Sequence, residues 1–240
     1  MPDTVESEVP LEVRLRQEPV APWPHTVFLV VVLGLWAAYG ALRMRLPATM
    51  MPRVFTYTSS IIVQCLLVGT TIAGLYHRRQ FLVGVLGERA TWQVLPDLAK
   101  GFGVYLAGCV TMLIVGVATT PLHLVRPSGV VQALAPHTRP ELALWLLVSL
   151  SAGVGEEFLF RGYLLRQFTR WSGSTAVAIG ASAALFGCMH FYEGTTAVVL
   201  ITGLGALFAV VAVRRGDLRT VMVAHFLQDA ITGLFLYLHR

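Results

Sequence analysis

Six ionisable residues interrupt the apolar C-terminal part of the chain: two adjacent glutamates, an arginine, two histidines and an aspartate. They are Glu156, Glu157, Arg161, His190, His225 and Asp229. A charge at the centre of a bilayer costs about 2.5–3.5 kcal/mol on insertion scales. Carboxylates and imidazoles commonly transfer protons in catalysis, and a carboxylate withdrawn from water becomes a stronger base. Because six such residues together carry a large free-energy cost of insertion, we expect them to serve one shared functional site.

The spacing of these residues predicts two pairs on helical faces. Glu157 and Arg161 are four residues apart, so they lie on one face of a helix and can form an ion pair. His225 and Asp229 have the same spacing and also share a face. For Glu157 and Arg161, an internal pair that ties helices together is as plausible as a chemical role.

Turns near Gly173, Gly194 and Gly216 set the depth of each residue. Glu156 lies 17 residues before Gly173 and His190 lies 17 after it, so an antiparallel hairpin places both at one level. The last span fits less well. If the helices continue to alternate in direction at Gly194 and Gly216, the residue of the last span at the depth of Glu156 and His190 is near Leu234. At 1.5 Å per residue, Asp229 is then about 8 Å and His225 about 14 Å from that depth.

Seven apolar runs carry these residues, each close to the ~20 residues that a membrane-spanning helix needs. The runs cover approximately 25–46, 54–76, 98–119, 142–165, 174–192, 195–213 and 218–238. Small residues are frequent in the fifth and sixth runs and allow close helix packing in lipid. A polar tail at 1–24, with five acidic residues and five prolines, precedes the runs.

The composition agrees with a membrane protein. The chain is 55% hydrophobic and only 13% charged, with a mean hydropathy of +0.68, whereas soluble domains carry about 25% charged residues. We therefore expect an all-α, polytopic membrane helical bundle of about seven transmembrane helices over 25–240. This excludes a secreted disulfide scaffold, a disordered regulator and a nucleic-acid-binding domain. The three cysteines lie in apolar runs at no zinc-site spacing, and we expect them to be buried.

The basic residues indicate orientation and origin. They stand in short groups between apolar runs, 11 on one side and 6 on the other, which favours a cytoplasmic N-terminus. Only one of the 18 basic residues is a lysine, which indicates a GC-rich bacterial genome. We expect a multi-pass protein of the bacterial inner membrane, with the lipid bilayer as a partner and no nucleic acid.

Three motifs in the last four runs resemble one family. They are Glu156–Arg161 (EEFLFR), Phe186–His190 (FGCMH) and His225–Asp229 (HFLQD). Together they resemble the EExxxR, FxxxH and Hxxx(N/D) motifs of the CPBP family of intramembrane proteases, also called the Abi or CAAX-protease family. The resemblance covers roughly residues 140–238 and implies an intramembrane endopeptidase with its catalytic core in that segment.

The resemblance also implies a role for each residue. Glu156 looks like the general base that activates water, and His190 like its partner in holding that water. Glu157 and Arg161 match an orienting pair. His225 and Asp229 match the groups that face the scissile carbonyl.

Two mechanisms fit these residues. In a metalloprotease, His190, His225 and Asp229 would bind zinc, with water as the fourth ligand and Glu156 as its base. In a metal-free glutamate mechanism, His225 and residue 229 donate hydrogen bonds to the oxyanion. Many family members have asparagine at position 229. An ionised aspartate cannot donate a hydrogen bond but is a good ligand for a divalent cation, which slightly favours zinc.

The substrate implied is a membrane-associated or C-terminally anchored protein or peptide, because the family includes enzymes that trim prenylated CAAX tails, process peptides or cleave membrane anchors. Three alternatives remain open. Ser182, in a Gly-Ala-Ser-Ala stretch, could act as a nucleophile with His225 as its base. Intramembrane carboxylates and histidines also suit a proton- or metal-coupled transporter. A bacteriocin-immunity-like protein would bind a peptide without cutting it.

Overall fold

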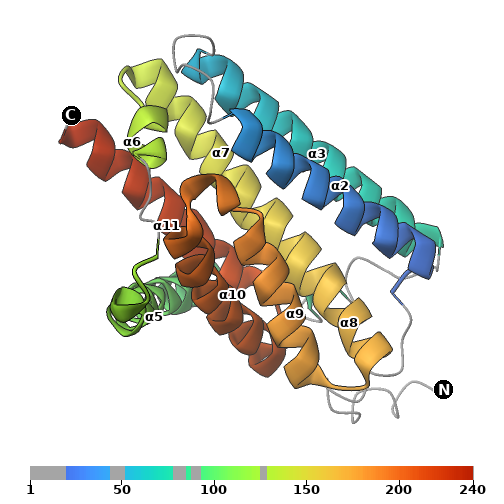
Figure 1. Cartoon of the computed structure of the whole chain (residues 1–240). Coiled ribbons are helices and arrows are strands. Elements are labelled where there is room, and N and C mark those ends of the chain that lie inside the picture. The colour runs from blue at the N-terminus through green and yellow to red at the C-terminus, as the bar shows by residue number, and fades with distance from the viewer. Residues whose placement is uncertain (1–19, 44–51, 78–84, 88–92, 125–128, 240) are drawn as a thin grey trace.

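The computed structural model describes residues 20–43, 52–77, 85–87, 93–124 and 129–239, and these residues form a bundle of helices without a strand (Figure 1). The predicted tail at 1–24 falls largely outside the described residues. The helical elements are α2 (Trp23–Arg43), α3 (Arg53–His77), α5 (Val94–Thr119), η3 (Thr120–Leu122), α6 (Val130–Leu134), α7 (Arg139–Glu157), η4 (Phe158–Leu164), α8 (Leu165–Ser172), α9 (Thr175–Cys188), η5 (Phe191–Glu193), α10 (Thr195–Arg215) and α11 (Arg219–Leu238).

Six of the described helical segments are long and apolar enough to cross a membrane, which confirms an all-α multi-pass bundle close to the predicted seven. The difference is the run predicted at 174–192. It forms the 14-residue helix α9 and the short turn η5, because the helix ends at Cys188. At 1.5 Å per residue α9 is about 21 Å long, shorter than a bilayer core of about 30 Å.

One continuous helical segment of 34 residues, Arg139–Ser172, carries the two glutamates. It begins with a capping box, in which the Thr138 hydroxyl accepts from the Glu141 backbone N–H and the Glu141 carboxylate accepts from the Thr138 N–H. It ends at Gly173, where a φ of +67° reverses the chain. All three predicted turn glycines, Gly173, Gly194 and Gly216, have a positive φ.

Helix α7 lies at the centre of the bundle. Helix α3 packs along one side of it and α11 along another, while α5 packs against α11 and α10 on the side of the bundle away from α3 (Figure 1). Helix α9 packs between α8 and α10. The backbones approach closely at Gly187, where an added Cβ would lie 2.6 Å from the Val198 carbonyl oxygen of α10. Small residues therefore bring α9 and α10 together, as the sequence predicts.

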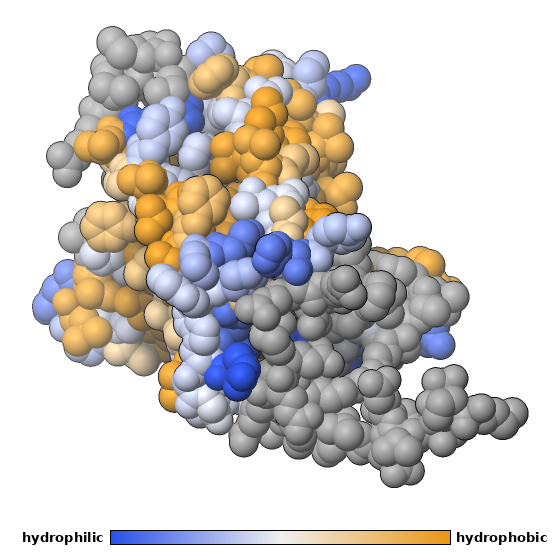
Figure 2. Space-filling model, turned by 90° about the vertical axis from the view of Figure 1, so that its right-hand side faces the viewer, coloured by the Kyte–Doolittle hydropathy of each residue, from blue (hydrophilic) through white to orange (hydrophobic). Residues whose placement is uncertain are grey.

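Large apolar side chains cover the outside of α2, α3 and α5, and hydrophobic residues occupy much of the described surface on the side of α2 and α3 (Figure 2). The expectation that the cysteines are buried is wrong. Cys65 and Cys188 are exposed and Cys109 is half-buried. An apolar run predicts buried side chains only in a water-soluble protein. A membrane-spanning helix also directs apolar side chains outward, to the lipid.

Candidate active site

A buried carboxylate joins three of the predicted residues. Glu157 Oε1 accepts from the Arg161 guanidinium at 2.9 Å and from His225 Nδ1 at 2.8 Å. The side chains of Glu157 and Arg161 are both fully buried, so the predicted i,i+4 pairing is confirmed. Because a carboxylate only accepts hydrogen bonds, His225 Nδ1 carries the proton. The same contact fixes the plane of the imidazole ring and directs Nε2 away from Glu157.

Arg161 ties this carboxylate to the neighbouring helices. Its Nη2 donates to the Gly205 carbonyl of α10 at 3.0 Å, and its guanidinium lies 4.3 Å from the centre of the Phe186 ring of α9. A guanidinium over an aromatic face is attracted by the ring quadrupole. Phe186 thus has a packing role, and Arg161 connects α7, α9 and α10 behind the imidazole of His225.

The segment after the glutamates is a seven-residue π-helix, η4, and π-helical turns are frequent at functional sites. The Ser182 hydroxyl of α9 donates to the Phe160 carbonyl within it at 2.9 Å. Ser182 is fully buried, and the Nδ1 of its proposed base, His225, is held by Glu157. The interpretation of Ser182 as a nucleophile is therefore wrong, and its role is to bind the π-helical backbone.

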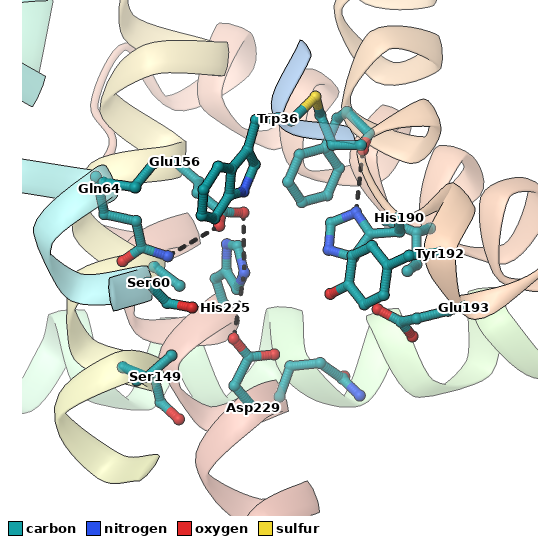
Figure 3. Close-up of a pocket in the computed structure, with 18 of the residues that line it drawn as sticks. Trp36, Ser60, Gln64, Ser149, Glu156, His190, Tyr192, Glu193, His225 and Asp229 are labelled. Atoms are coloured by element: carbon teal, nitrogen blue, oxygen red, sulfur yellow. Dashed lines mark hydrogen bonds and ion pairs between the residues drawn. The ribbon is translucent and has the colours of Figure 1, made fainter. Parts of the chain in front are cut away.

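A cavity of about 440 Å³ opens in front of this network, within the range of small-molecule sites (Figure 3). Its polar lining gathers where α3, α7, α11 and η5 meet. The labelled polar side chains are Ser60, Gln64, Ser149, Glu156, His190, Tyr192, Glu193, His225 and Asp229. Four of the predicted residues, Glu156, His190, His225 and Asp229, thus line one cavity.

Glu156 faces His225 across part of this cavity. Glu156 Oε2 lies 3.9 Å from His225 Nε2, and Asp229 Oδ2 lies 3.6 Å from the same nitrogen. Both separations exceed a direct hydrogen bond and suit polar groups that share a bridging water. The Glu156 side chain is 25% exposed, so one carboxylate of the pair opens to the cavity and the other, that of Glu157, is closed off.

His190 lies on the opposite wall of the cavity (Figure 3). Its Nδ1 donates to the Phe186 carbonyl at 3.1 Å, which leaves Nε2 as the second ring nitrogen for other partners. The Tyr192 ring stacks on the imidazole with a centroid separation of 6.0 Å. Glu156 and His190 line the same cavity, as their predicted common depth requires.

The predicted zinc ligands do not converge on one point. In the part of the chain that the structure describes, no three His, Cys, Asp or Glu side chains are placed to hold a metal ion. His225 and Asp229 lie together on one wall and His190 on the other (Figure 3). Zinc binding by His190, His225 and Asp229 therefore stays a prediction.

The depth calculation for the last helix is wrong. The calculation assumes that α11 forms an antiparallel hairpin with α10, the helix before it in the sequence. In the structure α11 packs directly on α7 and only slightly on α10. Gly153 of α7 allows this packing, since a Cβ there would lie 2.9 Å from the Met222 carbonyl oxygen of α11. His225 therefore reaches Glu157 directly, instead of lying about 14 Å from that level.

Sequence reasoning missed several polar residues of the cavity. Gln64 of α3 donates from Nε2 to Glu156 Oε1 at 3.2 Å, and the signal for it was a single amide within an apolar run. Tyr192 and Glu193 follow His190 in η5 and line the same wall.

A comparison with protein families supports the resemblance seen in the three motifs. Residues 138–231 match the family described as type II CAAX prenyl endopeptidase Rce1-like. Over these residues the chain is similar to that family. The matched segment contains all six ionisable residues predicted for the site, whereas Gln64 lies outside it. No curated protein and no solved structure matches the chain.

The Rce1-like match supports a CAAX-type intramembrane endopeptidase in general terms. Together with the apolar helices it supports a multi-pass membrane protein that acts on a protein substrate within a lipid bilayer.

Proposed function

We propose that this protein is an endopeptidase that hydrolyses a peptide bond of a membrane-associated or C-terminally anchored protein, with Glu156 as the base that activates water. The observation that carries the proposal is the 3.9 Å separation of Glu156 Oε2 and His225 Nε2 across a cavity inside the helical bundle. A carboxylate and an imidazole this close together can act on one scissile bond, Glu156 through the attacking water and His225 through the carbonyl oxygen.

In the first step, Glu156 Oε2 takes a proton from the water as the water oxygen attacks the scissile carbonyl carbon. The lone pair of His190 Nε2 accepts a second hydrogen bond from the same water. General base catalysis of this kind contributes roughly 10²–10⁴-fold to a rate. The two walls of the cavity then bracket the water and the peptide between Glu156 and His190.

The carbonyl oxygen gains negative charge as the tetrahedral intermediate forms. His225 Nε2, protonated in addition to Nδ1, donates to that oxygen, and Asp229 at 3.6 Å holds the ring in place. The buried pair of Glu157 and Arg161 fixes His225 from the other side. Glu156 then returns its proton to the leaving amine, the C–N bond breaks, and a new carboxyl and a new amino terminus result.

The zinc alternative assigns His190, His225 and Asp229 as metal ligands. When bound there, zinc would polarise water and the scissile carbonyl. The donor set of two imidazoles and a carboxylate is chemically suitable, but the described side chains on opposite walls would have to close on the metal. Metal analysis of the purified protein distinguishes the two mechanisms.

For location and substrate, we propose the inner membrane of a bacterium and a bacterial peptide or membrane anchor. The scarcity of lysine supports a GC-rich bacterial source. Bacteria do not generally prenylate CAAX proteins, so an anchor or peptide is preferred over a prenylated tail. Cleavage of a single-pass anchored reporter and of a farnesylated CAAX peptide, measured side by side, separates these substrates.

The test of the proposed function is cleavage by the purified protein in proteoliposomes. We expect Glu156→Gln to lower the rate by at least about 100-fold, as loss of a general base requires. Glu141→Gln is the matched control, because this half-buried residue lies on the same helix outside the cavity lining and glutamine retains its capping role. A wild-type protein that binds the reporter without cutting it would favour an immunity-like role. Solute uptake that survives Glu156→Gln would favour a transporter.

A further inference from the structure

A chain of two hydrogen bonds leads from Ser151 of α7 through Gln64 of α3 to Glu156. The Ser151 hydroxyl contacts Gln64 Oε1, and Gln64 Nε2 lies 3.2 Å from Glu156 Oε1. All three side chains are half-buried at the junction of α3 and α7, and Gln64 and Glu156 line the cavity. The chain therefore ends on one of the two oxygens of the proposed base.

The direction of this chain follows from the chemistry of its ends. A carboxylate only accepts, so the amide nitrogen of Gln64 has to face Glu156. The amide oxygen of Gln64 then faces Ser151, whose hydroxyl donates to it. The reverse orientation of the amide would place two oxygens against each other at Glu156 Oε1. The carboxylate thus sets the orientation of the Gln64 amide. Ser151, whose hydroxyl also lies 2.9 Å from the Val148 carbonyl oxygen, supports the amide oxygen from the other side.

The consequence concerns which oxygen of Glu156 takes the proton. Oε1 accepts a hydrogen bond from the amide N–H of Gln64. If Oε1 were protonated, its O–H would face this N–H, which has no lone pair to accept it, and the hydrogen bond would be lost. Oε2 faces His225 Nε2 at 3.9 Å and opens to the cavity. The two oxygens are chemically different although they belong to one carboxylate.

We propose that Gln64, supported by Ser151, is a positioning residue that holds Glu156 Oε1 and so assigns the basic role to Oε2. The inference rests on the proposed function of Glu156 as base. It also makes α3, which lies outside the Rce1-like segment, part of the catalytic machinery. The N-terminal helices then do more than shield the site from lipid.

The experiment compares Gln64→Met with wild type in the proteoliposome cleavage assay. Methionine keeps the length of the side chain and removes the donor. Hydrogen bonds to charged groups are among the stronger ones, and we expect kcat to fall by about 10-fold or more while KM stays within about twofold and the thermal unfolding midpoint is unchanged. Gln132→Met, at an exposed position in α6, is the matched control and should leave both constants unchanged.

The variant Ser151→Ala removes the hydrogen bond between Ser151 and Gln64 and leaves Gln64 itself unchanged. We expect a smaller loss of kcat than in Gln64→Met. We also expect the double variant Gln64→Met with Ser151→Ala to be no slower than Gln64→Met alone, because the effects of substitutions within one hydrogen-bonded network are not additive. A kcat within twofold of wild type in Gln64→Met, a change confined to KM, or losses that multiply in the double variant would overturn the inference. These outcomes leave the proposed function intact, whereas an active Glu156→Gln variant would remove the proposed function itself.

Discussion

The close approach of α7 and α11 at Gly153 predicts a catalytic defect from a single added methyl group. In Gly153→Ala the new Cβ would lie 2.9 Å from the Met222 carbonyl oxygen and 3.0 Å from the Phe226 backbone nitrogen. Both are backbone atoms, so no side chain can move aside. To reach 3.4 Å, where ordinary van der Waals contact begins, α11 has to shift by about 0.5 Å relative to α7.

A shift of this size acts directly on the site, because His225 lies three residues beyond Met222 and is held to Glu157 of α7 at 2.8 Å. Catalytic groups tolerate about 0.5 Å of displacement, and a 1 Å error can cost about 100-fold. We therefore expect kcat/KM for the anchored reporter to fall by about 10-fold in Gly153→Ala. Overpacking should also lower the free energy of unfolding by about 1–3 kcal/mol.

Gly180→Ala is the matched control, since a Cβ at Gly180 of α9 would have no neighbour within 4 Å. Alanine has the higher helix propensity, so this variant should be as active as wild type and at least as stable. The reasoning would be refuted if Gly153→Ala, folded and inserted in liposomes, cleaved the reporter at a rate within twofold of wild type.

Three further outcomes follow from the site. Arg161→Met leaves the buried carboxylate of Glu157 without its cation and should lower the free energy of unfolding in mild detergent by about 3–5 kcal/mol; a loss below 1 kcal/mol would mean that the pair is not closed to water. Ser182→Ala should retain cleavage and lose about 1 kcal/mol of stability with its bond to the Phe160 carbonyl, and an inactive but folded variant would restore the serine mechanism. Dialysis against a strong zinc chelator should leave cleavage intact under the glutamate mechanism, whereas loss of activity that added Zn²⁺ restores would establish the zinc alternative.

Local features of the site could be predicted from the sequence because they depend on short spacing or on turns. The pairing of Glu157 and Arg161 follows from one helical turn, and it is confirmed at 2.9 Å. The common level of Glu156 and His190 follows from a single reversal at Gly173, since only one hairpin separates them. The three motifs also indicated the kind of family that residues 138–231 match, because each motif occurs on its own helix in the right order.

Features that depend on which helices touch could not be predicted in this way. The position of His225 was wrong because the order of helices along the chain does not say that α11 packs on α7. Gln64 was missed because the sequence marks ionisable residues in membrane spans clearly but marks a neutral amide only weakly. Ser182 was ambiguous for the same reason: the sequence shows a hydroxyl among small residues, and only its partner, the Phe160 carbonyl, distinguishes a structural role.

The early end of α9 has a consequence for the supply of water. After Cys188 the chain leaves the regular helix for η5. His190, Tyr192 and Glu193 belong to this irregular stretch and line the same cavity as Glu156, which lies midway along the Arg139–Ser172 segment. Non-helical backbone at membrane depth is tolerated only inside protein or along an aqueous space. Under the proposed function, we therefore expect the water consumed at each turnover to reach the cavity past His190, Tyr192 and Glu193 and not through lipid.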